Sequence, residues 1–399
     1  MLRDIRVSCA PHISQRLSTR RVMIDVVIGL VPAIAAAGYY FRIYALVLIP
    51  ICVISSVATE WLCNLIRKKP NSLGDFSAVV TGIILALSLP PSLPIWAAVI
   101  GGCFAVAIGK MVFGGLGANI FNPAMVGRAF LTASFGMLMT TWTVPATIDV
   151  TLPKIAPENM VDARTQATPL AWNKQAIKSE KKAKSLAKAI TECREKAEAC
   201  TKAKATAETK AEEEKWAGAY AEAIAEVEKQ TKAYANAKAE VEKYIQILNE
   251  QLKPTFTGEV GGCLGETSVI ALLIGGLYLL IRRTIVIHTP LAVLLSSFAF
   301  AEVCYLINPD SFIQPFFHLT SGGLMLGAFF IVTDPVTRPL TRRGMWIFGS
   351  GVGTITMLIR IVGEYPEGVM FAVLLMNAVT PLIDRLCRRV PTGGKPSMK

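Results

Sequence analysis

The chain has 399 residues, of which 52% are hydrophobic, and its mean hydropathy is +0.46. This composition excludes a soluble protein with one or two ordinary cores and indicates a polytopic membrane protein. The formal charge of +12 does not indicate a nucleic-acid interface, because the lysines and arginines lie at the ends of apolar runs or alternate with glutamate and form no patch among aromatic side chains.

The first apolar run follows an arginine-rich N-terminal segment. Residues 1–21 contain five arginines and no small-residue cleavage site before that run. We therefore expect no removable signal peptide, and we expect the first span to direct its own insertion into the membrane.

Ten apolar stretches are long enough to cross roughly 30 Å of hydrocarbon as helices. They lie at about 22–41, 43–65, 76–90, 95–113, 121–141, 266–281, 285–306, 317–333, 344–362 and 367–386. The third and the eighth are short, rich in glycine and closed by Leu-Pro-Pro (89–91) and by Asp334-Pro335. Both are candidates for broken or re-entrant helices.

Basic residues occupy alternate connections between these stretches, and short basic loops favour the cytoplasm. The basic groups are Arg16, Arg20 and Arg21; Arg67, Lys68 and Lys69; Lys110; Arg282 and Arg283; Arg338, Arg342 and Arg343; and Arg385, Arg388 and Arg389. We therefore expect both termini in the cytoplasm and the loop after the fifth stretch outside. Such a chain would be a multi-pass protein of the bacterial inner membrane.

Because five is odd, two sets of five spans have opposite orientations, which predicts an inverted repeat. We divide this all-α chain into an N-terminal five-helix repeat (1–141), an external loop (142–265) and a C-terminal five-helix repeat (266–399). Ligands of such repeats usually lie where the halves meet, near broken helices.

The external loop contains an insert, about 174–252, that is rich in Ala, Glu and Lys. Apolar or small residues recur in it at spacings of three and four, which predicts an antiparallel two-helix coiled coil with a break near Gly218. The first seam is Ala183, Leu186, Ile190, Cys193, Ala197 and Cys200, and the second is Ile224, Val227, Thr231, Tyr234, Lys238, Val241, Ile245 and Leu248. Docking on another protein and a solvated arm without a partner are both compatible with this pattern.

The nine cysteines show no CxxC or other spacing typical of metal sites. We therefore predict no iron–sulfur or zinc site. Isolated cysteines within membrane spans are usually packing residues.

Three stretches resemble a known family: GANIFNPAMVGRAFL (117–131), DARTQATPLA (162–171) and GAFFIVTDPVTRPLTRRG (327–344). They are similar to the membrane subunits shared by the Rnf complex, an ion-pumping ferredoxin:NAD oxidoreductase, and the sodium-pumping NADH:quinone oxidoreductase. The resemblance covers the ten spans and leaves out the insert. The short segment before the first span favours the Rnf type, the RnfD proteins, because the quinone-reductase type has a longer N-terminal extension.

The resemblance implies a covalent flavin in the external loop. In that family, FMN is joined through its phosphate to the last Thr of a Ser/Thr-Gly-Ala-Thr motif. Thr165-Gln166-Ala167-Thr168 matches this motif, with Gln in place of the usual Gly, and Asp162 matches an acidic residue three positions before it. The loop offers no histidine to activate the Thr168 hydroxyl, so a separate flavin transferase is implied. Thr168 followed by Pro169 also fits a helix N-terminus.

The family is also implied to hold a second, noncovalent flavin, such as riboflavin, between its halves. Asn119 and Asn122 are our candidates for its contacts, because amides can both donate to and accept from the edges of a flavin ring. Helix capping at the membrane entry explains the same residues equally well. Arg128, about two turns into the span, could be functional or could extend to the cytoplasmic interface.

The resemblance implies a subunit, inactive alone, of a redox-driven ion translocase that passes electrons from ferredoxin towards NAD through covalent FMN and moves Na⁺ or H⁺. Its implied partners are the other subunits of the Rnf membrane complex, the flavin transferase and the lipid bilayer. A channel or secondary transporter is the alternative, since five-plus-five repeats also build solute pores. The TQAT loop is the feature that such a pore does not need.

Overall fold

The structure is a computed structural model of the full chain. It describes residues 18–70, 72–142, 169–205, 209–250, 255–256, 261–266, 268–307, 309, 312–363, 365 and 367–387. These residues form helices and their connections, without any strand. Within the described ranges, five helices are long and apolar enough to cross a membrane, and three shorter apolar helices accompany them.

Residues 18–142 form the N-terminal half of the helical body. The helices are α1 (Thr19–Phe41), α2 (Ile43–Ile66), the short turn η1 (Leu73–Asp75), α3 (Ser77–Leu87), α4 (Ile95–Val106), α5 (Pro123–Ser134) and α6 (Gly136–Met139). α4 continues into a π-helical turn, η2 (Ala107–Met111). The fifth predicted stretch, 121–141, is therefore interrupted, because helix α5 ends at Ser134.

The C-terminal half of the body lies within residues 261–387. Its helices are α10 (Val269–Ile281), α11 (His288–Ile307), α12 (Pro315–Thr320), α13 (Leu324–Leu326), α14 (Arg342–Ile361) and α15 (Val369–Leu386), and the π-helical turn η5 (Gly327–Ile331) follows α13. The eighth predicted stretch is broken, as expected. The break lies at Ser321 and Gly322, where Gly322 has a φ of +70° that disfavours residues with a Cβ atom.

The two halves meet along α1 and α10. A Cβ atom on Gly275 of α10 would lie 1.9 Å from the carbonyl oxygen of Gly29 of α1, so the two backbones touch. Asp25, near the start of α1, pairs at 3.2 Å with Arg282, just after the end of α10. The two helices therefore run antiparallel.

A matching close contact occurs inside each half. In the first, a Cβ atom on Gly102 of α4 would lie 2.1 Å from Ser55 Oγ of α2. In the second, a Cβ atom on Gly353 of α14 would lie 2.1 Å from Ser296 Oγ of α11. Each half thus contains one glycine–serine contact at which two helices approach closely.

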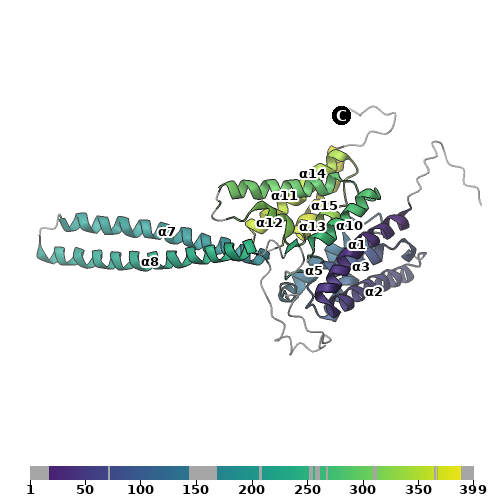
Figure 1. Ribbon diagram of the computed structural model, residues 1–399, viewed down its shortest axis with the longest axis horizontal. Coiled ribbons are helices and arrows are strands. Elements are labelled where there is room, and N and C mark those ends of the chain that lie inside the picture. Colours follow the sequence, from purple (N-terminus) through teal and green to yellow (C-terminus); the bar gives the residue numbers. More distant parts are fainter. Residues whose placement is uncertain are drawn as a thin grey trace, which may run out of the picture.

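The insert forms two long helices that lie side by side and project from the body (Figure 1). They are α7 (Pro169–Ala205) and α8 (Lys210–Glu250). The predicted break near Gly218 is wrong, because α7 ends at Ala205 and α8 begins at Lys210, so Gly218 is inside α8. A glycine in an exposed helix costs only about 1 kcal/mol, which a helix of 41 residues tolerates.

The predicted seam of the hairpin is largely confirmed. Ala183 and Ala197 of α7 and Val241 of α8 are buried between the helices. Ile224, Thr231 and Lys238 of the predicted second seam are instead exposed, and Ala237 is buried beside Lys238. The small core predicts weak packing along the arm.

The hairpin is fixed to the body at its base. Trp172 of α7 and Leu248 of α8 pack with Ile313 and Phe317, which lie just before and within α12. The base therefore rests on the broken region of the second half.

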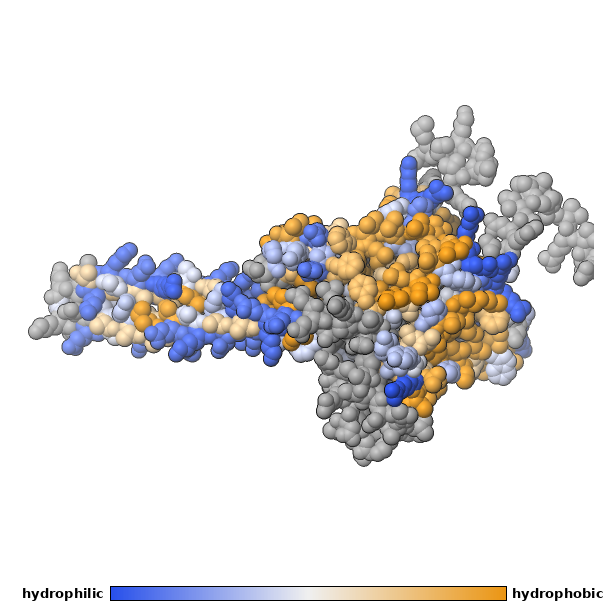
Figure 2. Space-filling model, in the orientation of Figure 1, coloured by the Kyte–Doolittle hydropathy of each residue, from blue (hydrophilic) through white to orange (hydrophobic). Residues whose placement is uncertain are grey.

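Hydrophobic side chains cover much of the visible surface of the body, whereas charged side chains cover the hairpin (Figure 2). The exposed apolar residues include Leu46, Ile54, Ile66, Ile281 and Ile307. Contiguous apolar surface of this extent is unfavourable in water and typical of contact with lipid. The structure is that of a multi-pass membrane protein.

Candidate functional site

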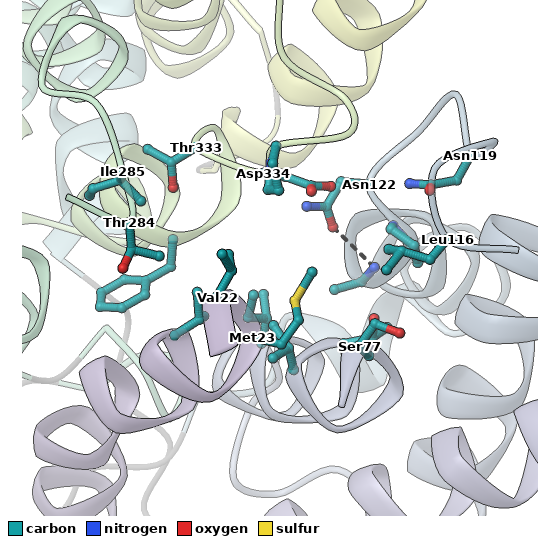
Figure 3. Close-up of a pocket in the computed structure, with 18 of the residues that line it drawn as sticks. Val22, Met23, Ser77, Leu116, Asn119, Asn122, Thr284, Ile285, Thr333 and Asp334 are labelled. Carbon is teal, nitrogen blue, oxygen red and sulfur yellow. Dashed lines mark hydrogen bonds between the residues drawn. The ribbon is translucent and has the colours of Figure 1, made fainter. Parts of the chain in front are cut away.

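An open pocket lies between the two halves, at the end of the body where α1, α3 and α5 begin and α10 and η5 end (Figure 3). Apolar side chains form most of its wall, and the polar side chains of Ser77, Thr81, Asn119, Asn122, Thr284, Thr333 and Asp334 also line it. Both halves contribute to the lining. The pocket is thus at the interface where an inverted repeat is expected to bind a ligand.

Asn122 begins α5 and joins the two halves. Its Oδ1 accepts from the backbone N–H groups of Ala124 (3.1 Å) and Met125 (3.3 Å), which caps the helix. Its Nδ2 donates to the carbonyl oxygen of Ile331 in η5 (3.4 Å). The capping interpretation is confirmed, and the amide has a second N–H that can serve a ligand in the pocket.

Asn119 stabilises the loop that leads into α5. Its Oδ1 accepts from Gly117 N (3.3 Å), and its Nδ2 donates to the carbonyl oxygen of Phe121 (3.2 Å). The side chain is 5% exposed and lines the same pocket as Asn122. The structure therefore brings the two predicted asparagines together, with roles in local structure as well as in the pocket wall.

Thr168 and Asp162 lie outside the described residues. The described chain resumes at Pro169, the first residue of α7. Leu170 of this first turn is buried against the broken region of the second half: a Cβ atom on Gly322 would lie 2.6 Å from Leu170 Cδ1, 3.0 Å from Arg360 Nη2 and 3.2 Å from Glu367 Oε1. The predicted attachment motif therefore immediately precedes, in the sequence, a helix start that lies beside Arg360 and Glu367.

Arg128 takes part in a buried charge cluster between the halves. Its guanidinium donates to the Glu367 carboxylate, lies 3.9 Å from Glu266 Oε1 and is 3.4 Å from Cys263 Sγ. Arg128 comes from α5 of the first half, and its partners come from the segments before α10 and α15 of the second. Arg128 does not extend to the surface, as an arginine that reached the cytoplasmic interface would, because its carboxylate partners hold it inside the protein.

Arg360 provides a second buried cation near this cluster. Its Nη1 donates to the carbonyl oxygen of His318 (2.6 Å), and its Nη2 donates to that of Ser321 (2.9 Å). These carbonyls lie at the end of α12 and in the break that follows it. The guanidinium therefore satisfies backbone acceptors that a broken helix leaves unpaired.

Sequence reasoning did not identify Glu266, Glu367 and Arg360 as a group. The sequence did contain a signal for this group, because charged residues at the ends of apolar spans are costly to bury and are often paired with one another. Cys263, Glu266 and Glu367 place three potential metal-ligating atoms within 4.8 Å of one another. The Arg128 guanidinium, however, already provides a positive charge at that position.

Comparison with known proteins gives concordant results. The model of the NQR2, RnfD, RnfE family matches residues 6–393. The chain is similar to the D subunit of the Na⁺-translocating ferredoxin:NAD⁺ oxidoreductase complex of Acetobacterium woodii, with 38% identity covering 96% of this chain and 94% of the relative. It is also similar to the D subunit of the ion-translocating oxidoreductase complex of Stutzerimonas stutzeri, with 36% identity covering 96% of this chain and 95% of the relative. A third relative is the D subunit of the proton-translocating ferredoxin:NAD⁺ oxidoreductase complex of Clostridium ljungdahlii, with 35% identity covering 97% of this chain and 96% of the relative.

These matches extend over both helical halves and the segment between them. A family model that covers residues 6–393 leaves only the extreme ends of the chain unmatched. The chain belongs to the NQR2, RnfD, RnfE family.

Proposed function

We propose that the chain is the flavin-carrying membrane subunit of an ion-translocating ferredoxin:NAD oxidoreductase complex, in which it works with other subunits. The observation that carries this proposal is the similarity, over nearly the whole chain, to proteins named for that activity. The relatives are named for both Na⁺ and proton translocation at similar identity. Their names therefore do not select the ion for this chain.

We propose that Thr168 carries FMN as a phosphoester. The start of α7 supports this site, because a phosphate on the residue before Pro169 would lie at the positive end of a 37-residue helix. Leu170, two residues further on, holds that helix end beside Arg360. Asp162 is included in the motif on the resemblance alone.

The attachment requires an activated flavin nucleotide and an enzyme. The bond that forms joins the Thr168 oxygen to the FMN phosphorus, the hydroxyl proton leaves, and a pyrophosphate bond of a flavin dinucleotide breaks to release a nucleoside monophosphate. A threonine hydroxyl is a weak nucleophile without a base, and so a separate flavin transferase is part of the proposal. When bound, the flavin ring accepts and donates one or two electrons.

We propose the pocket between the halves as the site of a second, noncovalent flavin. Its apolar walls, from Val22, Val26, Ile84 and other side chains, match the faces of a planar ring, and polar groups such as Asn122 and Thr284 match its edges. The chain's own contribution would be to bind and orient the ring and to exclude water from it.

We further propose ten membrane spans in two inverted five-helix repeats, with both termini in the cytoplasm and the loop at 142–265 outside the bacterial inner membrane. The antiparallel packing of α1 on α10 and the matching contacts at Gly102 and Gly353 support this topology. An external flavin would receive electrons across the membrane from a cytoplasmic donor. That crossing can be coupled to the movement of an ion.

In-gel ultraviolet fluorescence of the denatured chain tests the flavin proposal against the alternative of a pore without a redox role. Chain expressed with a flavin transferase should give a fluorescent band, and Thr168→Ala should give a dark one. Thr165→Ser is the matched control, since the motif accepts Ser or Thr at that position, and this variant should stay fluorescent. A dark band for the unmodified sequence would favour the pore.

A further inference from the structure

A second pocket lies between the halves, towards the opposite end of α5 from the first pocket. Arg128 and Glu367, two members of the buried charge cluster, form one of its walls. Met139, Trp142 and Phe371 are among the side chains of the remaining wall. The charge cluster is therefore open to a space that both halves line.

Arg128 has unused hydrogen-bond donors at this wall. Its contacts with Glu367, Glu266 and Cys263 all use Nη2. A guanidinium has five N–H donors, and the three on Nη1 and Nε meet no acceptor among the residues that the structure describes. Because Arg128 is only 9% exposed and buried donors are normally paired, these N–H groups indicate an acceptor that enters the pocket.

The rest of the pocket suits a flat apolar group. Trp142 is 6% exposed and Met139 is 3% exposed, and the rings of Tyr365 and Phe371 pack edge to face with centroids 5.7 Å apart. Aromatic and thioether side chains pack well on a planar ring. A phosphate or a carboxylate would satisfy Arg128 but would leave these side chains without a contact. A planar ring with acceptors in its own plane fits both walls, since the guanidinium is itself a planar fork.

The chain on either side of the predicted attachment motif lies at this pocket. Trp142, the last described residue before residue 169, lines it. At the other end, the Cβ position of Gly322 is 2.6 Å from Leu170 Cδ1 and 3.2 Å from Glu367 Oε1. Leu170 is two residues after Thr168, so a group attached to Thr168 is tethered close to the pocket.

We propose that the second pocket binds the ring of the flavin attached to Thr168, and that Arg128 donates from Nη1 and Nε to the N1 and C2-carbonyl edge of that ring. This inference rests on the proposed function, because it takes FMN on Thr168 as the tethered group. Glu367 is a positioning residue, since it holds Arg128 through Nη2 and leaves the other donors for the ring. Reduction adds electron density at this edge, and the N–H donors stabilise it.

Visible circular dichroism and reduction potential of the folded chain test the inference, with the spectrum of Thr168→Ala subtracted to remove any noncovalent flavin. A ring held in the pocket should give a dichroism band. Arg128→Lys keeps a charge for Glu367 but loses the planar fork. This variant should lose most of the band, and its midpoint potential should fall by roughly 30 mV or more, which is a tenfold change for a two-electron couple.

Arg282→Lys is the matched control, because Arg282 is also paired with a carboxylate, that of Asp25, but does not line this pocket. It should keep the dichroism band and the potential of the parent. In-gel fluorescence of the denatured chain reports attachment separately. A bright gel band for Arg128→Lys with unchanged dichroism and potential would overturn this inference and leave flavin attachment standing, whereas a dark band for the unmodified sequence would overturn both.

Trp142→Leu provides a second readout if Arg128→Lys is not recovered as a folded protein. An indole beside a flavin quenches its emission, so loss of Trp142 should raise the emission of the folded chain towards that of the denatured chain, with an equally bright band on the denaturing gel. Unchanged emission of folded Trp142→Leu would show that the ring lies elsewhere and would overturn the inference.

Discussion

Arg128 shows how a single charged residue can connect the two halves of the body. It leaves α5 of the first half and pairs with Glu367 of the second, and all three groups of the cluster, including Glu266, are largely buried. Pairing in such a place is not strongly stabilising in itself, but removal of one partner leaves a charge without compensation. These buried charges are therefore paired only when the two halves associate correctly.

Replacement of Arg128 should destabilise the chain through the carboxylates it leaves behind. We expect Arg128→Met to lower the free energy of unfolding by about 3–5 kcal/mol, measured as a fall in the thermal midpoint of the full chain in detergent. Arg128→Met with Glu367→Gln should recover part of that loss, because it removes the unpaired charge. An unchanged midpoint for Arg128→Met alone would contradict the pairing.

Asn122 has two possible roles that one pair of variants separates. Asn122→Ala removes the cap of α5, with an expected cost of about 0.5–2 kcal/mol, whereas Asn122→Ser retains a good cap. If the amide also contacts a flavin in the pocket, both variants should lose noncovalent flavin, measured by chromatography after denaturation. Full retention in the serine variant would leave Asn122 with the capping role alone.

At the scale of helices, the packing of α1 on α10 depends on the absence of side chains at Gly29 and Gly275. We expect Gly275→Ala to cost about 1–3 kcal/mol, because its Cβ atom would overlap the Gly29 carbonyl and force the backbones apart. Gly218→Ala is the matched control, since a Cβ atom there meets nothing within 4 Å among the described residues. That variant should be neutral or stabilising by roughly 0.5–1 kcal/mol. Equal thermal midpoints for Gly275→Ala and the parent would contradict the contact.

Helices are predicted best from the sequence where the hydrophobic period, or the residue that ends the helix, lies within the same short stretch of chain. The long spans at α1, α2, α11, α14 and α15 are close to the predicted stretches, and the break of the eighth lies at its glycine pair, Gly322 and Gly323. The predicted turn of the hairpin is wrong because Gly218 resembles a terminator, although long helices tolerate one exposed glycine. The π-helical turns leave no periodic signal, since each adds one residue to an otherwise regular helix.

Part of the candidate site can also be predicted from the sequence, where the signal lies within a short stretch of chain. Asn119 and Asn122 stand next to a proline and the start of a span, and both lie in the pocket. The partners of Arg128 and Lys110 are not predictable in this way, because Glu367 and Glu60 lie 239 and 50 residues away along the chain. Only the folded arrangement of the halves brings such pairs together.

For the molecule as a whole, the proposed topology places the hairpin and the C-terminus on opposite sides of the membrane. Variants that keep only Cys193, in the hairpin, or only Cys387, after α15, report the side on which each segment lies, because both side chains are partly exposed. A membrane-impermeant maleimide should label Cys193 in spheroplasts and Cys387 only in inverted vesicles. Labelling of Cys387 in spheroplasts would contradict the ten-span arrangement.

The central claim is that Thr168, immediately before α7, is the attachment point of a flavin that passes electrons. Tandem mass spectrometry of the proteolytic peptide containing residue 168, from chain matured with a flavin transferase, tests it most directly. The peptide should be heavier by one FMN minus one water, and its fragments should place that mass on Thr168. An unmodified peptide, or the same mass on Thr165, would contradict the claim.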